Sequence, residues 1–323
     1  MAGNGTQAGL VAVVGSVNTD YVMRVAHRPR PGETVTDAVL EVHGGGKGAN
    51  QALAAAKCGA RVELLSRVGD DPMGKARLEQ LTEEGVGTTR VLVTPGVASG
   101  VAVITLTPDG ENDIIVAPGA YARLSPADME GASEQIGRAT VLLAQFEVPM
   151  ETVTRAVQLA SGGAQVVINC APFRPVPPAV LERADVVVVN ELEAAQLSGL
   201  PVSSPEDVLA AAPRVLGLGP RAVVVTMGAQ GAVVVSDDFS AHIPAPATNP
   251  VDTTGAGDAF AGALAATLAM GNTLLEAAKL GVVVGSATTE HVGAAAVVPQ
   301  QVRRWSSGEE PSPAGRTTAT TSP

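Results

Sequence analysis

Two aspartates near the C-terminal end bracket a turn whose residue types suit acid–base chemistry. The stretch from Asp252 to Asp258 reads DTTGAGD, and Phe260, Leu264 and Leu268 follow at the spacing of one buried helix stripe. A helix is therefore predicted to begin at the glycines, where free amides attract an anion. Asp258 would stand beside that anion, placed to take a proton from an attacking hydroxyl. The alternative is that Asp258 only caps the helix.

A second candidate site lies near the N-terminus, where residues 44–51 read GGGKGANQ and lead into an apolar helix predicted over 52–58. Three consecutive glycines are costly to order, so close approach of the backbone to a ligand is the favoured explanation, and a flexible hinge is the alternative. Lys47 and Asn50 are three residues apart, so one face of the helix start presents both. Together they could hold hydroxyls or a phosphate.

The elements that must position these residues form a repeating pattern. Residues 10–14 are an apolar run typical of a buried strand, and Asn18 and Asp20 follow directly after it. These two residues either contact a ligand at the carboxyl end of a parallel strand or are ordinary loop residues. From residue 140 onward, strands are predicted at 141–144, 166–168, 186–189, 222–225 and 232–235, with helices near 150–161, 191–198 and 205–216.

Such alternation predicts parallel strands with crossover helices, whose carboxyl ends share one rim. Polar residues recur where these strands end, although each one alone is more often a cap than a catalyst; they are Glu147, Asn169, Cys170, Asn190, Glu193, Thr226 and Gly228. The connection between 225 and 232 is too short for a crossover, so the last two strands are predicted to form a hairpin at the sheet edge. A long helix is predicted from about 273 to 290.

A second, smaller sheet is predicted beside this body. Residues 34–42 show a loose two-residue period, and two further strands, 101–106 and 114–116, flank a turn at 108–110. No helix separates these strands, so a small antiparallel sheet is expected, of a kind that can act as a lid.

Bulk properties restrict the class of protein. The chain has 323 residues, enough for one large or two ordinary domains, and only 2% aromatic residues, so its core must be aliphatic. A formal charge of −11 argues against nucleic acid or an anionic membrane as main partner. Two cysteines are too few for a disulfide framework, and no signal peptide or membrane-length apolar run is apparent. We expect a cytoplasmic protein with a loose N-terminus over 1–9 and a disordered tail over 305–323.

The motifs at 45–51 (GGKGANQ) and 252–258 together resemble the two signatures of the ribokinase-like, or phosphofructokinase-B, carbohydrate kinases. Four shorter segments appear in the family's order, at 15–20, 31–34, 110–112 and 190–193, and the similarity covers about residues 10–300. The resemblance implies an α/β fold in three layers, with a mostly parallel central sheet flanked by helices and a small β-sheet lid. The kinase domain would span 10–304, with lid strands at about 17–45 and 99–118.

The resemblance also implies ATP-dependent phosphorylation of the 5-hydroxyl of D-ribose. Asp258 matches the catalytic base, and the amides of Gly255, Ala256 and Gly257 match the anion hole for the γ-phosphate. Positions that bind the sugar are matched by Asn18, Asp20, Gly46, Lys47, Asn50, Glu147 and Asp258. Nucleotide positions are matched by Asn190, Thr226, Gly228, Gly231 and Gly257. Glu193 matches a glutamate linked to Mg²⁺, and an activating K⁺ would be bound at Asp252, Thr254, Thr288, His291 and Gly293.

The chain departs from the family pattern at two places. Where these kinases usually read Gly-Ala-Asn, it has Gly119-Ala120-Tyr121, and residues 294–297 lack the polar residues usual in the potassium loop.

The alternative functions are a kinase of 2-deoxyribose, of another sugar or of a nucleoside, and a catalytically silent sugar-binding regulator. Few aromatic residues argue against stacking a nucleoside base, and a silent binder has no need of Asp258. A homodimer through the lid is expected, since an open strand edge invites pairing.

Overall fold

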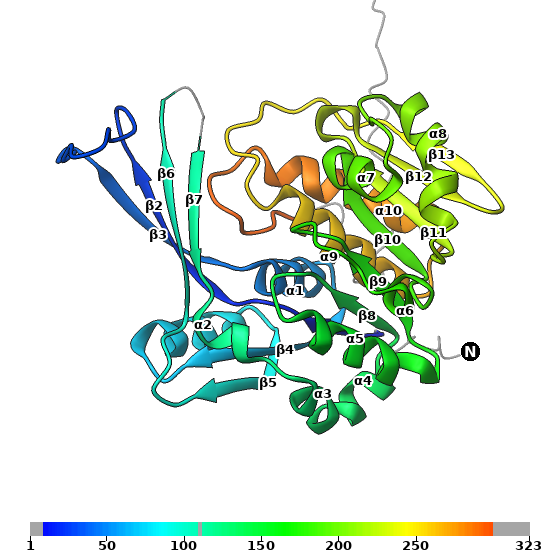
Figure 1. The fold of residues 1–323 in the computed structure, drawn as a ribbon, viewed down its shortest axis with the longest axis horizontal. Coiled ribbons are helices and arrows are strands. Elements are labelled where there is room, and N and C mark those ends of the chain that lie inside the picture. Colours follow the sequence, from blue (N-terminus) through cyan, green and yellow to red (C-terminus); the bar gives the residue numbers. More distant parts are fainter. Residues whose placement is uncertain (1–8, 109–111, 300–323) are drawn as a thin grey trace, which may run out of the picture.

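A large and a small sheet make up the β-structure of the protein in a computed structural model that describes residues 9–108 and 112–299 (Figure 1). The large sheet has nine strands in the order β13-β12-β11-β10-β9-β8-β1-β4-β5. Neighbours are parallel from β11 to β5, and β12 is antiparallel to both of its neighbours. The bounds are β1 Leu10–Val14, β4 Arg61–Gly69, β5 Gly87–Thr94, β8 Val141–Ala144, β9 Gln165–Asn169, β10 Val186–Asn190, β11 Ala222–Thr226, β12 Ala232–Ser236 and β13 Ser240–Ile243.

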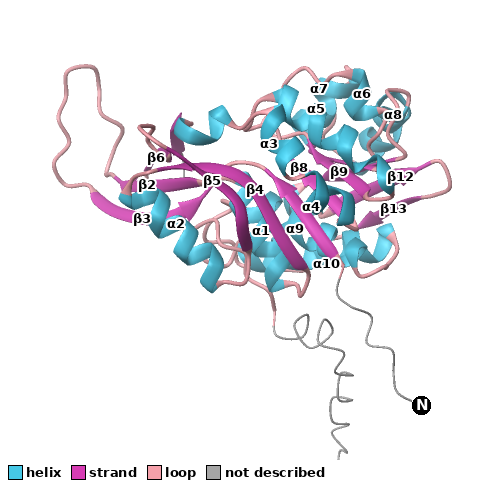
Figure 2. Cartoon of the chain, turned by 90° about the horizontal axis from the view of Figure 1, so that it is seen from below, coloured by secondary structure: helices cyan, strands magenta, loops and turns pink. Residues whose placement is uncertain are grey.

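Helices cover both faces of this sheet, because its central strands are apolar on both sides (Figure 2). In β1, Val11 and Val13 join the core under the first helix layer, while Ala12 and Val14 join the core under the second. The first layer comprises α1 Lys47–Lys57, α2 Pro72–Glu83, α9 Ala256–Ala269 and α10 Leu274–Thr288. The second comprises α3 Pro126–Gly131, α4 Ser133–Arg138, α5 Met150–Leu159, α6 Pro178–Leu181, α7 Glu191–Ser198 and α8 Pro205–Leu216. Short 3-10 helices are η1 Gly119–Arg123, η2 Ala160–Gly162 and η3 Gly228–Gln230.

The small sheet stands beside this body and has the strand order β3-β2-β6-β7, with bounds β2 Asn18–Arg24, β3 Val39–Gly45, β6 Gly100–Leu106 and β7 Asn112–Ala117. Its base row pairs Asn18 with Gly45 on one side and with Gly100 on the other. Successive side chains alternate between the two faces. Asp20 therefore shares one face with Ala102 and Val116, whereas Tyr21 shares the other with Val103 and Ile115.

Several expected elements are confirmed. The strands predicted at 10–14 and from 141 onward are present, and helices follow at 150, 191, 205 and 274. The mostly parallel sheet between helices and the separate small sheet match the fold expected from the resemblance. The helix predicted over 52–58 begins earlier, at Lys47, so that Lys47 and Asn50 both lie in its first turn.

Other expectations were wrong in detail. The small sheet is mixed rather than antiparallel, because β2 and β6 are parallel; each continues outward from a parallel strand of the large sheet, β1 or β5. The strand expected at 34–42 covers 39–45. The β11–β12 hairpin does not end the sheet, because β13 pairs with β12 and forms the edge. The turn centred on 109–110 and the tail over 305–323 lie outside the described residues, as does nearly all of segment 1–9. None of the described helices has the length and apolarity required to span a membrane.

Candidate active site

Asp258 lies in the first turn of α9 and is almost completely buried, with 6% of its surface exposed. One carboxylate oxygen accepts a hydrogen bond from Gln51 Nε2 at 2.9 Å, and the other accepts one from Asn50 Nδ2 at 3.3 Å. The ammonium group of Lys47 lies 3.8 Å from Oδ1. The negative charge of Asp258 raises the pKa of Lys47, so the ammonium form is favoured beside the carboxylate. The two motifs of the sequence thus meet at one carboxylate.

Gln51 is the residue of this cluster that sequence reasoning did not assign. Its Nε2 also lies 3.0 Å from Asn169 Oδ1, and its Oε1 accepts a hydrogen bond of 2.7 Å from Gln145. Gln51 and Gln145 are fully buried, so these amides have no water to compensate for a lost partner. The chain of amides therefore fixes the orientation of Asp258 from β8, β9 and α1 at once. The only sequence signal was the position of Gln51 within the GGKGANQ motif.

The turn before α9 requires glycine at its N-cap. Gly255 has φ +76°, a left-handed conformation, and a Cβ built there would lie 2.6 Å from the backbone of Ala294. The amides that open α9 lack partners inside the helix, which makes this end an anion site. The Ala256 amide donates to the Thr253 carbonyl at 3.3 Å, so this one of the three predicted anion-hole amides is already engaged.

A second polar group lies at the junction of the large and small sheets. Glu147 Oε2 accepts a hydrogen bond from the Lys47 amide at 3.0 Å and another from the hydroxyl of Ser16. Asn18 and Asp20 are buried at the base of β2, and each has a side-chain oxygen, Oδ1, without a hydrogen-bond partner. Buried acceptors are rarely left unpaired in a folded protein, so these oxygens call for a polar partner, which water or a ligand can supply. Gly46, whose φ is +91°, places the start of α1 against Ser16 and Asn18.

Burial, together with the charge of Glu147, raises the pKa of Asp20 to about 6. His43 and Arg77 act in the opposite direction, but less strongly. The pKa of Asp20 is therefore raised well above the usual range of an aspartate.

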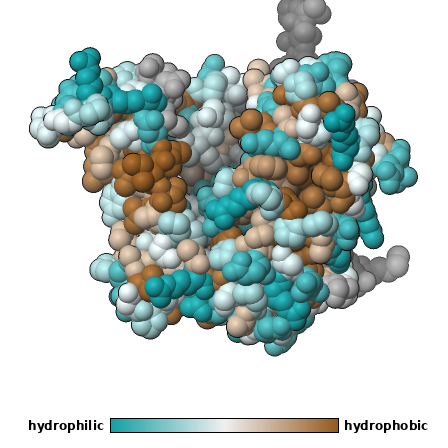
Figure 3. Space-filling model, in the orientation of Figure 1, coloured by the Kyte–Doolittle hydropathy of each residue, from teal (hydrophilic) through white to brown (hydrophobic). Residues whose placement is uncertain are grey.

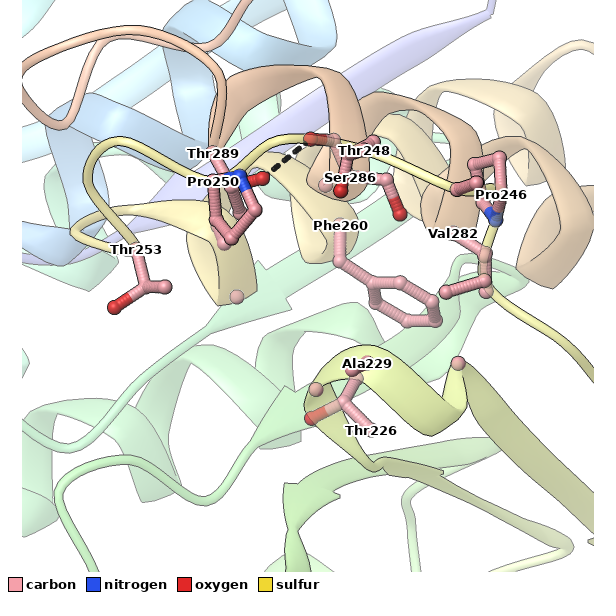
Figure 4. Close-up of a pocket in the computed structure, with 17 residues that line it drawn as sticks. Thr226, Ala229, Pro246, Thr248, Pro250, Thr253, Phe260, Val282, Ser286 and Thr289 are labelled. Carbon is pink, nitrogen blue, oxygen red and sulfur yellow. Dashed lines mark hydrogen bonds between the residues drawn. The ribbon is translucent and has the colours of Figure 1, made fainter.

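A cavity of about 500 Å³ opens on the other side of the α9 N-terminus (Figure 4). Four of the five predicted nucleotide residues line it: Thr226, Gly228, Gly231 and Gly257, whereas Asn190 is not among the lining residues described. Phe260, Val282 and Pro246 supply apolar walls that sequence reasoning did not assign. Four glycines and Ala229 leave the backbone of the lining accessible, which suits a flat, largely apolar ligand group.

Asn190 and Glu193 form a capping box at the start of α7. Glu193 Oε2 accepts from the Asn190 amide at 2.9 Å, and Asn190 Oδ1 accepts from the Glu193 amide at 2.8 Å. Burial raises the pKa of Glu193. The negative charge of Asp258 also raises this pKa, whereas the positive charge of Lys47 lowers it. No group of three or more His, Cys, Asp or Glu side chains suited to a metal occurs in residues 9–108 and 112–299. A single carboxylate of this kind suits Mg²⁺ that is held mainly by phosphates and water.

The predicted potassium residues lie in the loop before α9 and at the end of α10 with the loop that follows it, and Asp252 joins the two segments. Its carboxylate accepts hydrogen bonds of 2.9 Å from the amides of Thr254 and Gly293. Burial alone would raise the pKa of Asp252, but these bonds hold it below its usual range. Thr288 is buried and its hydroxyl accepts from the Val297 amide, while His291 is exposed. The ring of His43, from the small sheet, lies within 4 Å of the position of a Cβ on Gly293.

Comparison with known proteins shows the family. The profile of the pfkB family carbohydrate kinases matches residues 8–301. The chain belongs to this family. A ribokinase of Haemophilus influenzae is 34% identical over 90% of this chain and 95% of its own. A deoxyribokinase of Salmonella typhi is 37% identical over 79% of this chain and 84% of its own. The structure of Arabidopsis thaliana ribokinase complexed with ribose and ATP is 30% identical, with a TM-score of 0.82, covering 89% of this chain and 96% of that one.

Membership of the pfkB family makes this protein a ribokinase-like kinase that acts on an alcohol group, with ATP as co-substrate. The geometry agrees with phosphoryl transfer, which needs positioning and charge stabilisation rather than covalent chemistry by the protein. Asp258 contacts a cluster of buried polar groups, and its neighbours Ala256 and Gly257 line the largely apolar cavity.

Proposed function

We propose that the protein phosphorylates D-ribose at its 5-hydroxyl, with Asp258 as the general base. The observation that carries the proposal is that Lys47 and Asn50 meet the buried carboxylate of Asp258 in the first turn of α9. The unpartnered oxygens of Asn18 and Asp20 add further buried polar groups. A pentose is rich in hydroxyls, and Lys47, Asn50 and Glu147 add the polar partners that such a ligand needs. The overall similarity of the chain to a ribokinase complexed with ribose and ATP supports this choice.

In this reaction the 5-oxygen attacks the γ-phosphorus, the bond between that phosphorus and the bridging oxygen of ADP breaks, and the hydroxyl proton passes to Asp258. Gln51 and Asn50 hold the carboxylate so that its remaining acceptor positions face the hydroxyl. Amides at the start of α9 stabilise the charge that develops on the transferred group. Lys47 stabilises the ionised carboxylate before attack. The small sheet acts as the lid that excludes water.

The residues present fit two metal ions. Glu193 would hold Mg²⁺, which neutralises phosphate charge when bound, through water. Carbonyl oxygens of the loops at 252–254 and 288–293 would hold K⁺, an ion that prefers such donors. Asp252, whose two oxygens both accept amides, joins these loops and keeps Gly255 in register with them.

The test is release of ADP from Mg-ATP with D-ribose, 2-deoxyribose, fructose and adenosine, each with and without K⁺. Ribose should give the highest kcat/KM, and K⁺ should raise kcat. Higher kcat/KM on 2-deoxyribose would instead favour a deoxyribokinase, a candidate supported by the deoxyribokinase at 37% identity. No turnover on any acceptor, with ribose binding still measurable, would contradict the proposal and indicate a silent regulator.

Ribose binding should depend on pH through Asp20. Sugar hydroxyls donate to a carboxylate, so bound ribose favours ionised Asp20 and lowers a pKa that is about 6 in the free protein. The affinity should therefore be constant above pH 7 and should weaken as pH falls below 6. Calorimetry at pH 6 in two buffers of different ionisation enthalpy should detect proton release, which should vanish at pH 8. Equal proton release by the Asp20→Asn variant would contradict this assignment.

We also propose that two copies associate through the small sheet. Figure 3 shows apolar side chains gathered over its strands, and Ile115 and Val42, on the face opposite Asp20, are 73% and 51% exposed. Exposed apolar patches of this kind mark association surfaces. Ile115→Asp should convert a dimer into a monomer in light scattering. Ile114→Asp, on the same strand but the other face and 54% exposed, is the matched control. A monomeric wild type would exclude the proposal.

A further inference from the structure

Tyr121 is among the largest fully buried side chains of the described residues, and nothing in the reaction described above uses it. It is one of two tyrosines in the chain and is 1% exposed. It lies in η1, which is held against the base of the small sheet by a hydrogen bond of 2.9 Å from the Ala120 amide to the Ala98 carbonyl. The resemblance predicts asparagine at this position, so Tyr121 departs from the family's usual pattern.

The ring of Tyr121 packs on Gly100. A Cβ built on Gly100 would lie 2.5 Å from Tyr121 Cε1 and 2.3 Å from Asn18 Oδ1. Asn18 and Gly100 pair in the base row of the small sheet. The side chain of Asn18 and a Cβ on Gly100 therefore point to the same face of the sheet as the side chains of Asp20 and Ala102. The ring therefore lies on the face that carries the unpartnered oxygens of Asn18 and Asp20.

The hydroxyl of Tyr121 lies among the same polar groups. The side chain of Asn18 is the neighbour of this hydroxyl. Burial raises the pKa of this phenol, and the negative charges of Glu147 and Asp20 raise it further, so the hydroxyl keeps its proton and can donate. Asp258 has a different set of contacts, formed by Lys47, Asn50 and Gln51. Tyr121 thus groups with Asn18 and Glu147 and takes no part in these contacts of Asp258.

We propose that Tyr121 is a specificity-determining residue of the acceptor site. Its hydroxyl, together with Asn18, binds a ring hydroxyl of a free pentose, and its ring blocks a substituent on the anomeric carbon. The inference rests on the proposed function, because a sugar whose 5-hydroxyl meets Asp258 directs its C1–C2 edge toward the opposite end. A site that hydrogen-bonds a hydroxyl rejects analogues that lack it, and a wall of fixed size rejects larger ones.

The experiment compares Tyr121→Phe and Tyr121→Ala with the wild type on four acceptors: ribose, 2-deoxyribose, 1,4-anhydroribitol and adenosine. Tyr121→Phe should lower kcat/KM for ribose about 10-fold, mainly through KM, as expected for one lost hydrogen bond. 2-Deoxyribose lacks the 2-hydroxyl of ribose, and 1,4-anhydroribitol lacks the 1-hydroxyl. For whichever of these two lacks the hydroxyl that Tyr121 binds, Tyr121→Phe should change kcat/KM less than about 2-fold. Tyr121→Ala should raise the ratio of adenosine to ribose kcat/KM at least about 10-fold.

Tyr21→Phe is the matched control. Tyr21 is the other tyrosine, its side chain lies on the opposite face of the small sheet, and its hydroxyl contacts Met73 Sδ at 3.1 Å. This variant should leave every acceptor ratio unchanged. An equal loss on all acceptors in Tyr121→Phe, or unchanged ratios in both variants, would overturn the inference. Absence of wild-type turnover on all four acceptors would instead contradict the proposed function. Thermal unfolding of each variant separates these outcomes from misfolding.

Discussion

Replacing Asp258 with asparagine should lower kcat about 10³-fold while the affinities for ribose and ATP change little. The amide keeps the size of the side chain but cannot accept the proton of the attacking hydroxyl, a contribution of roughly 10²–10⁴ in rate. It also removes the charge that Lys47 faces at 3.8 Å. The measurement is ADP release for kcat, with calorimetry for the two dissociation constants.

The control for this change is Asp237→Asn, in the exposed turn between β12 and β13, which should have wild-type turnover. Substantial turnover by Asp258→Asn would show that another group takes the proton. Loss of ribose binding in the same variant would show that Asp258 contributes more to holding the sugar than to proton transfer.

Gly255→Ala should be the second most damaging substitution. The residue has φ +76°, and its new Cβ would lie 2.6 Å from backbone atoms of Ala294, which a side-chain movement cannot relieve. The turn must shift, and the amides at the start of α9 shift with it. Loss of an aligned donor in such a hole costs about 10²–10³ in kcat, so we expect a loss of about 10²-fold together with a lower melting temperature.

Gly271→Ala provides the comparison for this variant. Gly271 has φ +84°, so alanine there carries the same backbone strain, but no atom lies within 4 Å of its Cβ position. Its expected cost is about 1 kcal/mol of stability, with unchanged kcat. If both variants lose stability equally and both keep wild-type kcat, the turn at Gly255 has no part in catalysis.

Much of the fold could be predicted because its strands are continuous apolar runs. The VVVV segment of β10 and similar runs of valine in β11 and β12 indicate strands buried on both faces. A polar residue ends each of these runs. Two of the strands that were missed, β4 and β5, contain arginine, glutamate and threonine among their apolar residues, so no clear period appears. The parallel pairing of β2 with β6 depends on how each strand leaves the large sheet, which no local pattern records.

The site was predicted from motifs rather than from contacts. Spacing indicated Asp258, Lys47 and Asn50, but Gln51 reaches Asp258 across 207 positions of sequence, and only the fold reveals that contact. Asn190 and Glu193 illustrate the opposite case, because both also serve as an ordinary capping box. A motif therefore identifies residues, but it does not show whether each of them has a structural role or a chemical one.

The base row of the small sheet has a consequence for how a lid of this form works. All four strands meet the body near the row of Gly45, Asn18 and Gly100, so the sheet is a flap attached along one edge. Displacement grows with distance from that axis. Asp20 is two residues from it, about 7 Å along the strand, whereas Arg24 at the far end is about 20 Å away. If the flap swings, Asn18 and Asp20 move little and the outer ends of its strands move most, so polar groups at the base stay pre-organised for a ligand.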